Sequence, residues 1–264
     1  MEHEAIIRLG AFFGVFAALA VWELAAPRSA LVAPKPGRWL TNWGLSVVNT
    51  GVTVAMKLAL GAAAVAAALD AQALGWGLFN HLAWPIWAEV LVVFLLLDLA
   101  IWAQHWLSHQ IPILWRLHRV HHADRDIDVT TAIRFHPIEI ALSMGLKILL
   151  VYLLGAPVVA VILFEVVLNG AAMFNHANIR LGGWDRLLRL VLVTPDMHRV
   201  HHSVHRDEHD MNYGFNLSIW DRLFGTYTPQ PRDGHQDMTI GLANHQDGAP
   251  TRFLWSLGFP FRRR

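Results

Sequence analysis

Long apolar segments alternate with short polar ones along this chain. A membrane helix needs about 20 consecutive, mostly apolar residues, and four segments reach that length: residues 5–26, 45–69, 86–106 and 137–174. The last is too long for one span, and Gly155-Ala156-Pro157 in its middle predicts a helical hairpin. The pattern therefore predicts an all-α integral membrane bundle of about four spans or hairpins.

The polar segments between the spans predict the orientation. Residues 27–43 are polar and basic, and Pro34 and Pro36 predict that this connector is not helical. Residues 109–136 are also basic, whereas residues 70–85 contain no Lys or Arg. By the positive-inside rule both basic regions lie in the cytoplasm. We expect one membrane domain, residues 1–264, with a cytoplasmic histidine-rich helical cap formed by residues 107–136 and 177–264.

Lys57 interrupts the second apolar segment. A lysine at that depth is costly unless it faces other helices or reaches the surface, so it is a candidate functional residue. The alternative, which we favour at this point, is a structural lysine that faces inward or extends to the interface.

Composition supports the membrane assignment and narrows the chemistry. Hydrophobic residues make up 55% of the 264 residues and charged residues 16%, with a net charge of +1 and no basic cluster of the kind that binds nucleic acid. The chain has no cysteine, which excludes disulfides, thiolate zinc sites and cysteine-bound iron–sulfur clusters. Any metal must be held by nitrogen and oxygen.

Histidine supplies that nitrogen in a repeated pattern. The five residues His-Arg-Val-His-His occur at 118–122 and again at 198–202. In a helix, the three- and four-residue spacings place these imidazoles on one face, so each copy is predicted to be a metal clamp. His105 and His109 repeat the four-residue spacing just upstream, and His136 and His176 stand singly.

The number of histidines indicates two metal ions. Ten candidate ligands exceed what one first-row ion takes. They are His105, His109, His118, His121, His122, His136, His176, His198, His201 and His202. Imidazole suits iron, copper, nickel or zinc, so ligand type leaves the metal open. Among the other histidines, His205 and His209 are undecided. We expect ordinary surface or packing residues at His3, His81, His235 and His245.

These motifs and their flanks resemble the fatty acid hydroxylase/sterol desaturase superfamily. The resemblance rests on His105-Trp106-Leu107-Ser108-His109, on the two pentads, on Arg134-Phe135-His136-Pro137, on Asn175-His176 and on the segments 212–214 and 220–226. One departure is Trp106, where many members carry arginine. The match covers about residues 97–227.

The resemblance implies a membrane di-iron enzyme that hydroxylates or desaturates a membrane lipid. It implies that the ten histidines hold two Fe²⁺ ions, that O₂ is the co-substrate, and that hydroxylation is favoured over desaturation. Iron is the candidate ion with redox chemistry suited to an aliphatic C–H bond. The sequence has no flavin, nicotinamide or haem motif, so a separate electron-donor protein is expected.

Acidic residues near the histidines are candidates to orient the ligand rings. Asp98, two helical turns before His105, is predicted to lie on the same face. The set is Asp98, Glu139, Asp207, Glu208, Asp210 and Asp221. Two alternatives remain open: a histidine-lined metal-binding or metal-transport protein, disfavoured because the histidines cluster at span ends, and a zinc hydrolase on the same scaffold.

Overall fold

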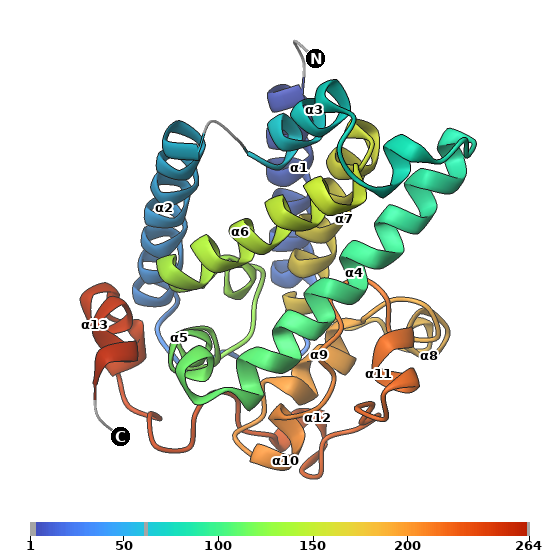
Figure 1. Cartoon of the computed structure of the whole chain (residues 1–264). Helices are drawn as coiled ribbons and strands as arrows, with labels where there is room; N and C mark the ends of the chain where they lie inside the picture. Colours follow the sequence, from blue (N-terminus) through green and yellow to red (C-terminus); the bar gives the residue numbers. More distant parts are fainter. Residues whose placement is uncertain (1–3, 61–62, 263–264) are drawn as a thin grey trace.

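A computed structural model describes residues 4–60 and 63–262, and it is helical throughout (Figure 1). Within these residues, five stretches are long and apolar enough to cross a membrane. They contain α1 (Glu4–Ala25), α2 (Lys35–Leu60) with α3 (Ala64–Leu74), α4 (Ile86–Gln110), α6 (Pro137–Leu154) and α7 (Val158–His176). Within the described ranges β-structure is limited to isolated bridges. The prediction of an all-α membrane bundle is confirmed.

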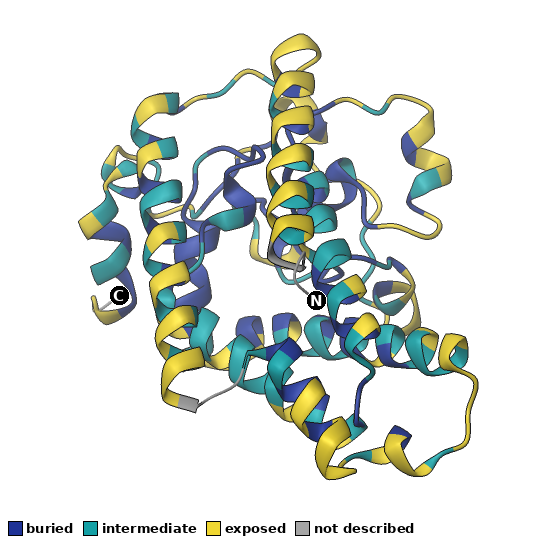
Figure 2. Cartoon of the chain, turned by 90° about the horizontal axis from the view of Figure 1, so that it is seen from above, coloured by how far each residue is buried: buried dark blue, intermediate teal, exposed yellow. Residues whose placement is uncertain are grey.

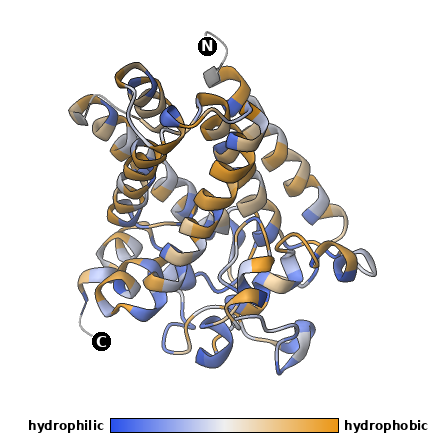
Figure 3. Ribbon diagram, turned by 45° about the vertical axis from the view of Figure 1, so that its right-hand side comes forward, coloured by the Kyte–Doolittle hydropathy of each residue, from blue (hydrophilic) through white to orange (hydrophobic). Residues whose placement is uncertain are grey.

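The remaining helices are short and lie below the long ones in Figure 1. They are α5 (Pro112–His122), α8 (Trp184–Leu188), α9 (Pro195–His201), α10 (Arg206–His209), α11 (Ile219–Leu223), α12 (Gly234–Asp237) and α13 (Phe253–Gly258), with 3₁₀ turns η2 (Thr131–Ile133), η3 (Ala249–Thr251) and η4 (Phe259–Phe261). A further 3₁₀ turn, η1 (Leu78–His81), lies between α3 and α4 at the opposite end of the long helices. Figure 3 shows the long helices as mainly hydrophobic and this lower part as mainly hydrophilic. The chain therefore has an apolar half and a polar half.

The prediction for the connector was wrong, because α2 begins at Lys35 rather than near residue 45. Pro36 lies in the first turn, where a helix does not need the backbone N–H that proline lacks. The helical turns between residues 35 and 45, which were not predicted, are held by a buried ion-pair network. Arg38 donates to Asp124 at 2.6 Å and to Asp128 at 2.7 Å. These bonds fasten the start of α2 to the loop that follows α5.

The second predicted span, residues 45–69, is also divided. Helix α2 ends at Leu60 and α3 begins at Ala64. Helix α3 is short and alanine-rich, and Ala67, Ala68 and Ala71 are fully buried. With Phe79, Leu97 and Phe164 it forms part of the main apolar core, to which α3, α4, α6 and α7 contribute. Small side chains allow this close packing between helices in an apolar medium.

The predicted hairpin is confirmed as α6 and α7. Gly155 ends α6 with a left-handed backbone, φ 63°, and Pro157 precedes the first turn of α7. Glycine is needed at Gly155 because a Cβ there would approach the Asn80 side chain at 2.6 Å and the Trp76 carbonyl at 2.7 Å. The hairpin returns the chain to the polar half, where α7 ends at His176.

The outer surfaces of the long helices are exposed and apolar. Figure 2 shows exposed residues along α1 and α2, which include Ile6, Leu9, Leu24, Leu40 and Leu58. Continuous apolar surface of this kind needs a partner other than water. Together with the five long apolar stretches, it indicates a multi-pass membrane protein.

Candidate metal centre

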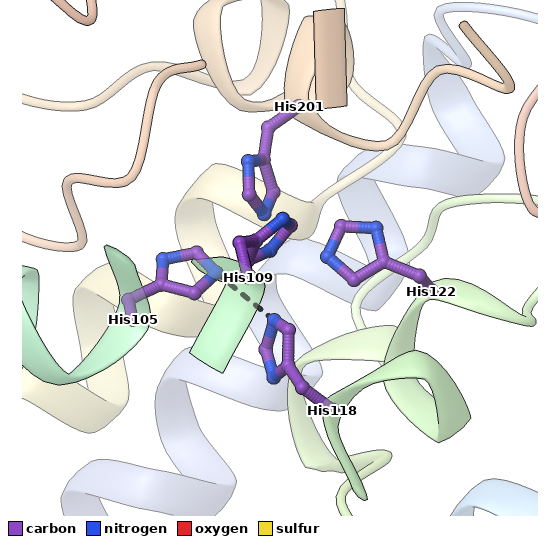
Figure 4. Close-up of side chains that lie close together, drawn as sticks. All are labelled: His105, His109, His118, His122 and His201. Atoms are coloured by element: carbon purple, nitrogen blue, oxygen red, sulfur yellow. Dashed lines mark hydrogen bonds between the residues drawn. The ribbon is translucent and has the colours of Figure 1, made fainter. Parts of the chain in front are cut away.

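Nine of the ten predicted ligands come together in the polar half as two adjacent, buried groups. The first group contains His105, His109, His118, His122 and His201, and Figure 4 shows their rings pointing toward one another. The second group contains His121, His176, His198 and His202. Within each group the potential ligand atoms lie within 4.8 Å of one another. No cysteine or carboxylate belongs to either group, so both offer only imidazole nitrogen.

Each pentad contributes to both groups, which corrects the expectation that each copy forms its own clamp. His118 and His122 belong to the first group and His121 to the second. In the other copy the assignment is reversed, since His198 and His202 belong to the second group and His201 to the first. Successive helical residues are about 100° apart around the axis. The last two histidines of a pentad therefore diverge and can serve two different ions.

The other residues of the pentads hold the site in place. Val120 and Val200 are fully buried. Arg119 donates to the Phe259 carbonyl and stacks on the Phe259 ring, with 4.1 Å between its guanidinium carbon and the ring centre. Arg199 donates to the Asn178 side chain at 2.8 Å. The arginines thus tie the two pentads to the C-terminal segment and to the end of α7.

Hydrogen bonds from Nδ1 fix how the rings are presented. The Nδ1 atoms of His105, His121, His176 and His201 lie 2.6–3.2 Å from backbone carbonyl oxygens, those of Tyr213, Arg134, Ala172 and Met211 respectively. A carbonyl oxygen can only accept, so in these rings Nδ1 carries the proton and Nε2 keeps its lone pair. Nε2 is therefore the atom offered to a metal.

Two carboxylates likewise contact Nδ1 of other rings in the first group. His118 Nδ1 lies 2.6 Å from Glu139 Oε1, and His109 Nδ1 lies 3.1 Å from Asp210 Oδ1. Glu139 and Asp210 thus contact rings of predicted ligands, as the sequence indicated. A carboxylate behind an imidazole orients the ring and increases its basicity toward a metal.

The remaining acidic candidates lie elsewhere, and the prediction for Asp98 was wrong. Asp98 accepts from Trp220 Nε1 at 2.8 Å, not from His105. The side chains of Asp207 and Glu208 form ion pairs with Arg232. Asp221 contacts a backbone turn beside the histidines and not a histidine ring. It accepts from the backbone N–H of Tyr213 at 2.8 Å and of Gly214 at 2.9 Å. It thereby fixes the turn whose carbonyl meets His105.

Asn212 organises that turn, and the sequence analysis did not single it out. It is the one non-glycine residue of the described chain with positive φ, 57°. Its side chain donates to the carbonyls of Met197 and Thr228 at 3.0 and 2.8 Å. Asparagine tolerates this left-handed backbone better than most residues. The carbonyls on either side, Met211 and Tyr213, then accept from His201 and His105.

His136 is not brought to the other nine histidines. Its Nδ1 accepts from the backbone N–H of Ile138 at 3.2 Å, and its Nε2 lies 3.2 Å from the Leu257 carbonyl. It caps α6 at its start, directly before Pro137. Because backbone groups occupy both ring nitrogens, the geometry supports a structural role for His136 in place of the predicted ligand role.

The undecided histidines separate clearly. His205 pairs with Asp233 near the surface, at 2.6 Å. His209 borders the first group, with His109 and Asp210, and stacks on Trp115, their ring centres 5.3 Å apart. Trp115 also packs against His109 and His122 and was missed from the sequence, where a tryptophan gives no sign of such a position. His3 lies outside the described residues.

The two groups fit metal ions because several Nε2 atoms that point into them have no protein hydrogen-bond donor as a partner. Buried nitrogens without a hydrogen bond include His109 Nε2, His122 Nε2, His201 Nε2 and His202 Nε2. Others face each other directly, with Nε2 atoms 3.0 Å apart in His105 and His118 and 3.1 Å apart in His121 and His176. Leaving such polar atoms unpaired is costly, and a bound cation would satisfy them together.

Electrostatics favours neutral rings, the form that binds metals. Burial disfavours the charged imidazole, and repulsion from neighbouring histidines adds to this effect. The pKa therefore lies well below its ordinary value in His121, His122, His198, His201 and His202. A site built from neutral imidazoles in this way is ready to accept cations near neutral pH.

The fold and the site thus define a helical membrane protein with two adjacent, buried groups of histidines that could hold metal ions. A model of the fatty acid hydroxylase family matches residues 90–226, just over half of the chain, and the chain belongs to this family. The match includes all ten predicted ligands, the nine histidines of the two groups and His136, and it runs from within α4 to just after α11.

Individual relatives are lipid-modifying enzymes. The chain is 33% identical over 183 residues to an ornithine lipid hydroxylase, OlsE, of Rhizobium tropici, which covers 69% of this chain and 53% of that protein. It is 34% identical over 134 residues to the human alkylglycerol monooxygenase, 51% of this chain and 29% of that protein. With rat cholesterol 25-hydroxylase it shares 28% over 149 residues, 54% of this chain and 48% of that protein. No solved structure matches the chain.

The chain spans about half or less of the length of these relatives. Family membership and the buried histidine groups indicate a metal-binding protein.

Proposed function

We propose that this protein is an O₂-dependent di-iron enzyme that hydroxylates a membrane lipid. The observation that carries the proposal is the pair of adjacent, all-imidazole groups. Their rings are in direct contact: the ring centres of His122 and His202 are 4.7 Å apart, and those of His201 and His202 are 5.5 Å apart. Two ions held by these groups would be close neighbours, as cooperation in one reaction requires.

The residues have separate tasks in this proposal. Five imidazoles would hold one iron and four the other, each through the inward nitrogen that the Nδ1 contacts leave free. When bound, the two irons would supply the redox chemistry that activates O₂ toward an aliphatic C–H bond, which no side chain can attack unaided. The protein orients the rings, keeps them neutral and excludes bulk water from the site, since the nine histidines are at most 5% exposed.

A cavity links the first group to the apolar half. Its volume is about 570 Å³, a size common for sites that bind small molecules. His105 and His118 form part of its lining, together with Phe135 and Phe215. Its lining includes residues of α1, α2, α4, α6 and α7, the long helices with lengths and compositions suited to crossing a membrane. A lipid could therefore reach the histidines from the bilayer.

The relatives support a lipid substrate and favour hydroxylation. Their names record a hydroxylase of an ornithine lipid, a monooxygenase of an alkylglycerol and a 25-hydroxylase of cholesterol. Desaturation begins with the same hydrogen abstraction and differs only in the fate of the carbon radical. We place hydroxylation first because each of these named relatives is a hydroxylase or monooxygenase.

We further propose that the histidine site faces the cytoplasm and that electrons come from a separate carrier protein. The Lys/Arg bias of the connecting segments supports this orientation. The polar half also exposes Arg116, Arg206 and Arg252. An acidic electron donor could dock on such a surface.

Isotope labelling tests the reaction. The purified protein, loaded with iron and supplied with a reductase system and ¹⁸O₂, should give a lipid product with one labelled oxygen. A product two hydrogens lighter and unlabelled would identify a desaturase. Label that arrives only from H₂¹⁸O, or turnover without O₂, would refute the oxidative proposal and restore the zinc hydrolase.

Reporter fusions test the orientation. A reporter fused after Arg264 should report the cytoplasm, and one inserted near Gly75 should report the opposite side. Gly75 follows α3, in the segment without Lys or Arg. The reverse pattern would refute the proposed location of the metal site.

A further inference from the structure

Three side chains at the edge of the first histidine group form a third, smaller group of potential metal ligands. They are His109, His209 and Asp210, whose ligand atoms lie within 4.8 Å of one another. His109 belongs to both groups. Its Nδ1 lies 3.1 Å from Asp210 Oδ1, and its Nε2 is buried without a hydrogen bond. The third group is therefore joined to the first by a shared imidazole.

The third group is more accessible to water than the two larger ones. The nine histidines of those groups are at most 5% exposed, whereas the Asp210 side chain is 25% exposed and that of His209 is 11% exposed. The half-buried ring of Trp115 stacks on His209 and packs against His109 and His122, so it covers the first group at this edge. An ion that arrives from water here meets Asp210 and His209 before it meets the first group.

The cavity of about 570 Å³ is another approach to the first group, but it suits a lipid better than a cation. It reaches His105 and His118, and its lining includes residues of the long helices that are suited to crossing a membrane. A cation that passed between such helices would lose its hydration in apolar surroundings, which is costly. Helix α10, which carries His209, lies instead at the bottom of the polar half in Figure 1. Cations therefore have a less costly approach on the polar side.

His209 and Asp210 present two acceptor atoms with a separation that suits a metal ion. His209 Nδ1 lies 3.3 Å from the Ser203 carbonyl oxygen, so Nδ1 carries the proton and Nε2 has a free lone pair. Arg206 donates to Asp210 Oδ2 at 3.1 Å, which leaves Oδ1 toward the histidines. His209 Nε2 lies 3.8 Å from Asp210 Oδ1, too far for a hydrogen bond. Because bonds from a metal to imidazole nitrogen or carboxylate oxygen are about 2.0–2.2 Å long, an ion between these two atoms would reach both.

We propose that His209 and Asp210 form an entry site, which captures a divalent metal ion from water and passes it to the first histidine group beside His109. This inference rests on the proposed function, because it takes the two larger groups as metal sites. Two ligands hold an ion more weakly than the five imidazoles of the first group, so the captured ion moves on. His209 therefore acts in loading the site and is not a ligand of the loaded site.

Loading of the metal-free protein with Co²⁺ tests the inference without turnover. Co²⁺ binds imidazole as the other first-row divalent ions do. The full chain in detergent is stripped of metal with a chelator and mixed with Co²⁺, and the visible absorption of histidine-bound Co²⁺ gives the loading rate. In the wild type this rate should rise with Co²⁺ concentration and then level off, because capture precedes transfer. The metal content after equilibration is measured separately by plasma mass spectrometry.

Two replacements of His209 separate the role of its nitrogen from the role of its packing. His209→Phe keeps a ring against Trp115, and His209→Gln keeps a donor for the Ser203 carbonyl. Both lack the imidazole lone pair, so both should load at least about tenfold more slowly at low Co²⁺ concentration. Their final metal content and absorption spectrum should equal those of the wild type. His205→Gln is the matched control and should load like the wild type, because His205 directly precedes the same helix and pairs with Asp233 near the surface.

Loading of either His209 variant at the wild-type rate would overturn the inference. So would a lower metal content of either variant after equilibration, because His209 would then be an ordinary ligand of the loaded site. These outcomes are separate from failure of the proposed function. Slow loading of both variants, without an ¹⁸O-labelled product from the iron-loaded wild type, would refute the hydroxylase alone. Labelled product together with unchanged loading of the variants would refute the entry site alone.

Discussion

The two histidine groups are built from the same repeated pentad, yet they differ in size and surroundings. Each receives two histidines from one pentad and one from the other. The first group gains two further rings, His105 and His109, from the end of α4, whereas the second gains only His176, from the end of α7. The first group therefore has five imidazoles and the second has four.

The surroundings of the two groups also differ, because the first group has contacts that the second group lacks. Two rings of the first group, His105 and His118, line the cavity of about 570 Å³, and none of the second group does. The first group is also the one with carboxylates behind its rings, Glu139 and Asp210. A repeated motif thus contributes to two histidine groups, and the flanking helices decide which of them borders the cavity.

The largest effects are expected when the last histidine of either pentad is replaced by alanine, because this removes one imidazole from one group only. His122 and His202 are the last residues of their pentads and belong to different groups. His202→Ala leaves three imidazoles in the second group and should lower iron from about two per chain to about one. His122→Ala leaves four in the first group and should retain more iron. Because both ions are needed, we expect both variants to lose more than about 100-fold in activity.

Iron measured by plasma mass spectrometry on anaerobically purified protein checks this ranking. His81→Ala is the control, since His81 is exposed on η1, far along the chain from the site. Alanine at His121 or His201 should also reduce iron sharply, one in each group. Full iron occupancy in all of these variants would refute the assignment of the groups as metal sites.

Loss of the carboxylate that contacts His118 should reduce iron affinity and activity less than loss of a proposed ligand. The reduction should be larger than that from loss of a nearby acidic residue that contacts no histidine ring. Glu139→Gln keeps the shape and removes the charge that supports His118. We expect a loss of about 10- to 100-fold in iron affinity or activity, the usual effect of such partners. Asp98→Asn is the matched comparison, because Asp98 accepts from Trp220 and contacts no ligand ring. Equal losses in both would show that the contact to His118 is unimportant.

Stability of the metal-free protein should fall as the pH is lowered through the ordinary histidine range. The pKa of His121, His122, His198, His201 and His202 is depressed by burial, so below about pH 6.5 the unfolded chain binds more protons than the folded one. Each such histidine costs about 1.4 kcal/mol per pH unit in that window. Thermal unfolding in detergent from pH 8 to pH 5.5 measures the slope.

Removing one buried histidine sharpens that test. His202→Gln should flatten the slope, because one proton-binding site of the unfolded chain is lost. The exposed His81→Gln should leave the slope unchanged. A stability of the metal-free protein that is independent of pH between 8 and 5.5 would contradict burial of the rings in neutral form.

The smallest effect is expected at the turn that serves the first group alone. Asn212→Ala places a Cβ-bearing residue without a side-chain amide at φ 57°, which costs about 1–2 kcal/mol for the backbone alone. Asn212→Gly removes the same amide without that strain, so the difference between the variants isolates the backbone term. Thermal unfolding gives both values. If alanine and glycine behave alike, the left-handed turn is not what positions the carbonyls of Met211 and Tyr213.

Local patterns were enough to predict much of the fold and most of the histidines that come together. Apolar length predicted α1, α4 and the hairpin of α6 and α7, because a membrane helix must satisfy its own backbone and is read from continuous hydrophobicity. Residue type and spacing predicted nine histidines that do meet. The same reasoning failed where a helix starts, at Lys35, because the energy that extends α2 comes from Arg38 bonding to Asp124, more than 80 residues away.

Tertiary structure alone decided how the histidines are shared. Spacing places each pentad on one helix, but whether His121 joins His118 or His176 depends on how α5, α7 and α9 pack. It also decided the partners of the rings. Four of them are backbone carbonyls, which every residue possesses, so no residue type in the sequence marks them. Asp98 lay on the expected helix face and still missed His105, because a carbonyl from a turn more than 100 residues away had taken that position.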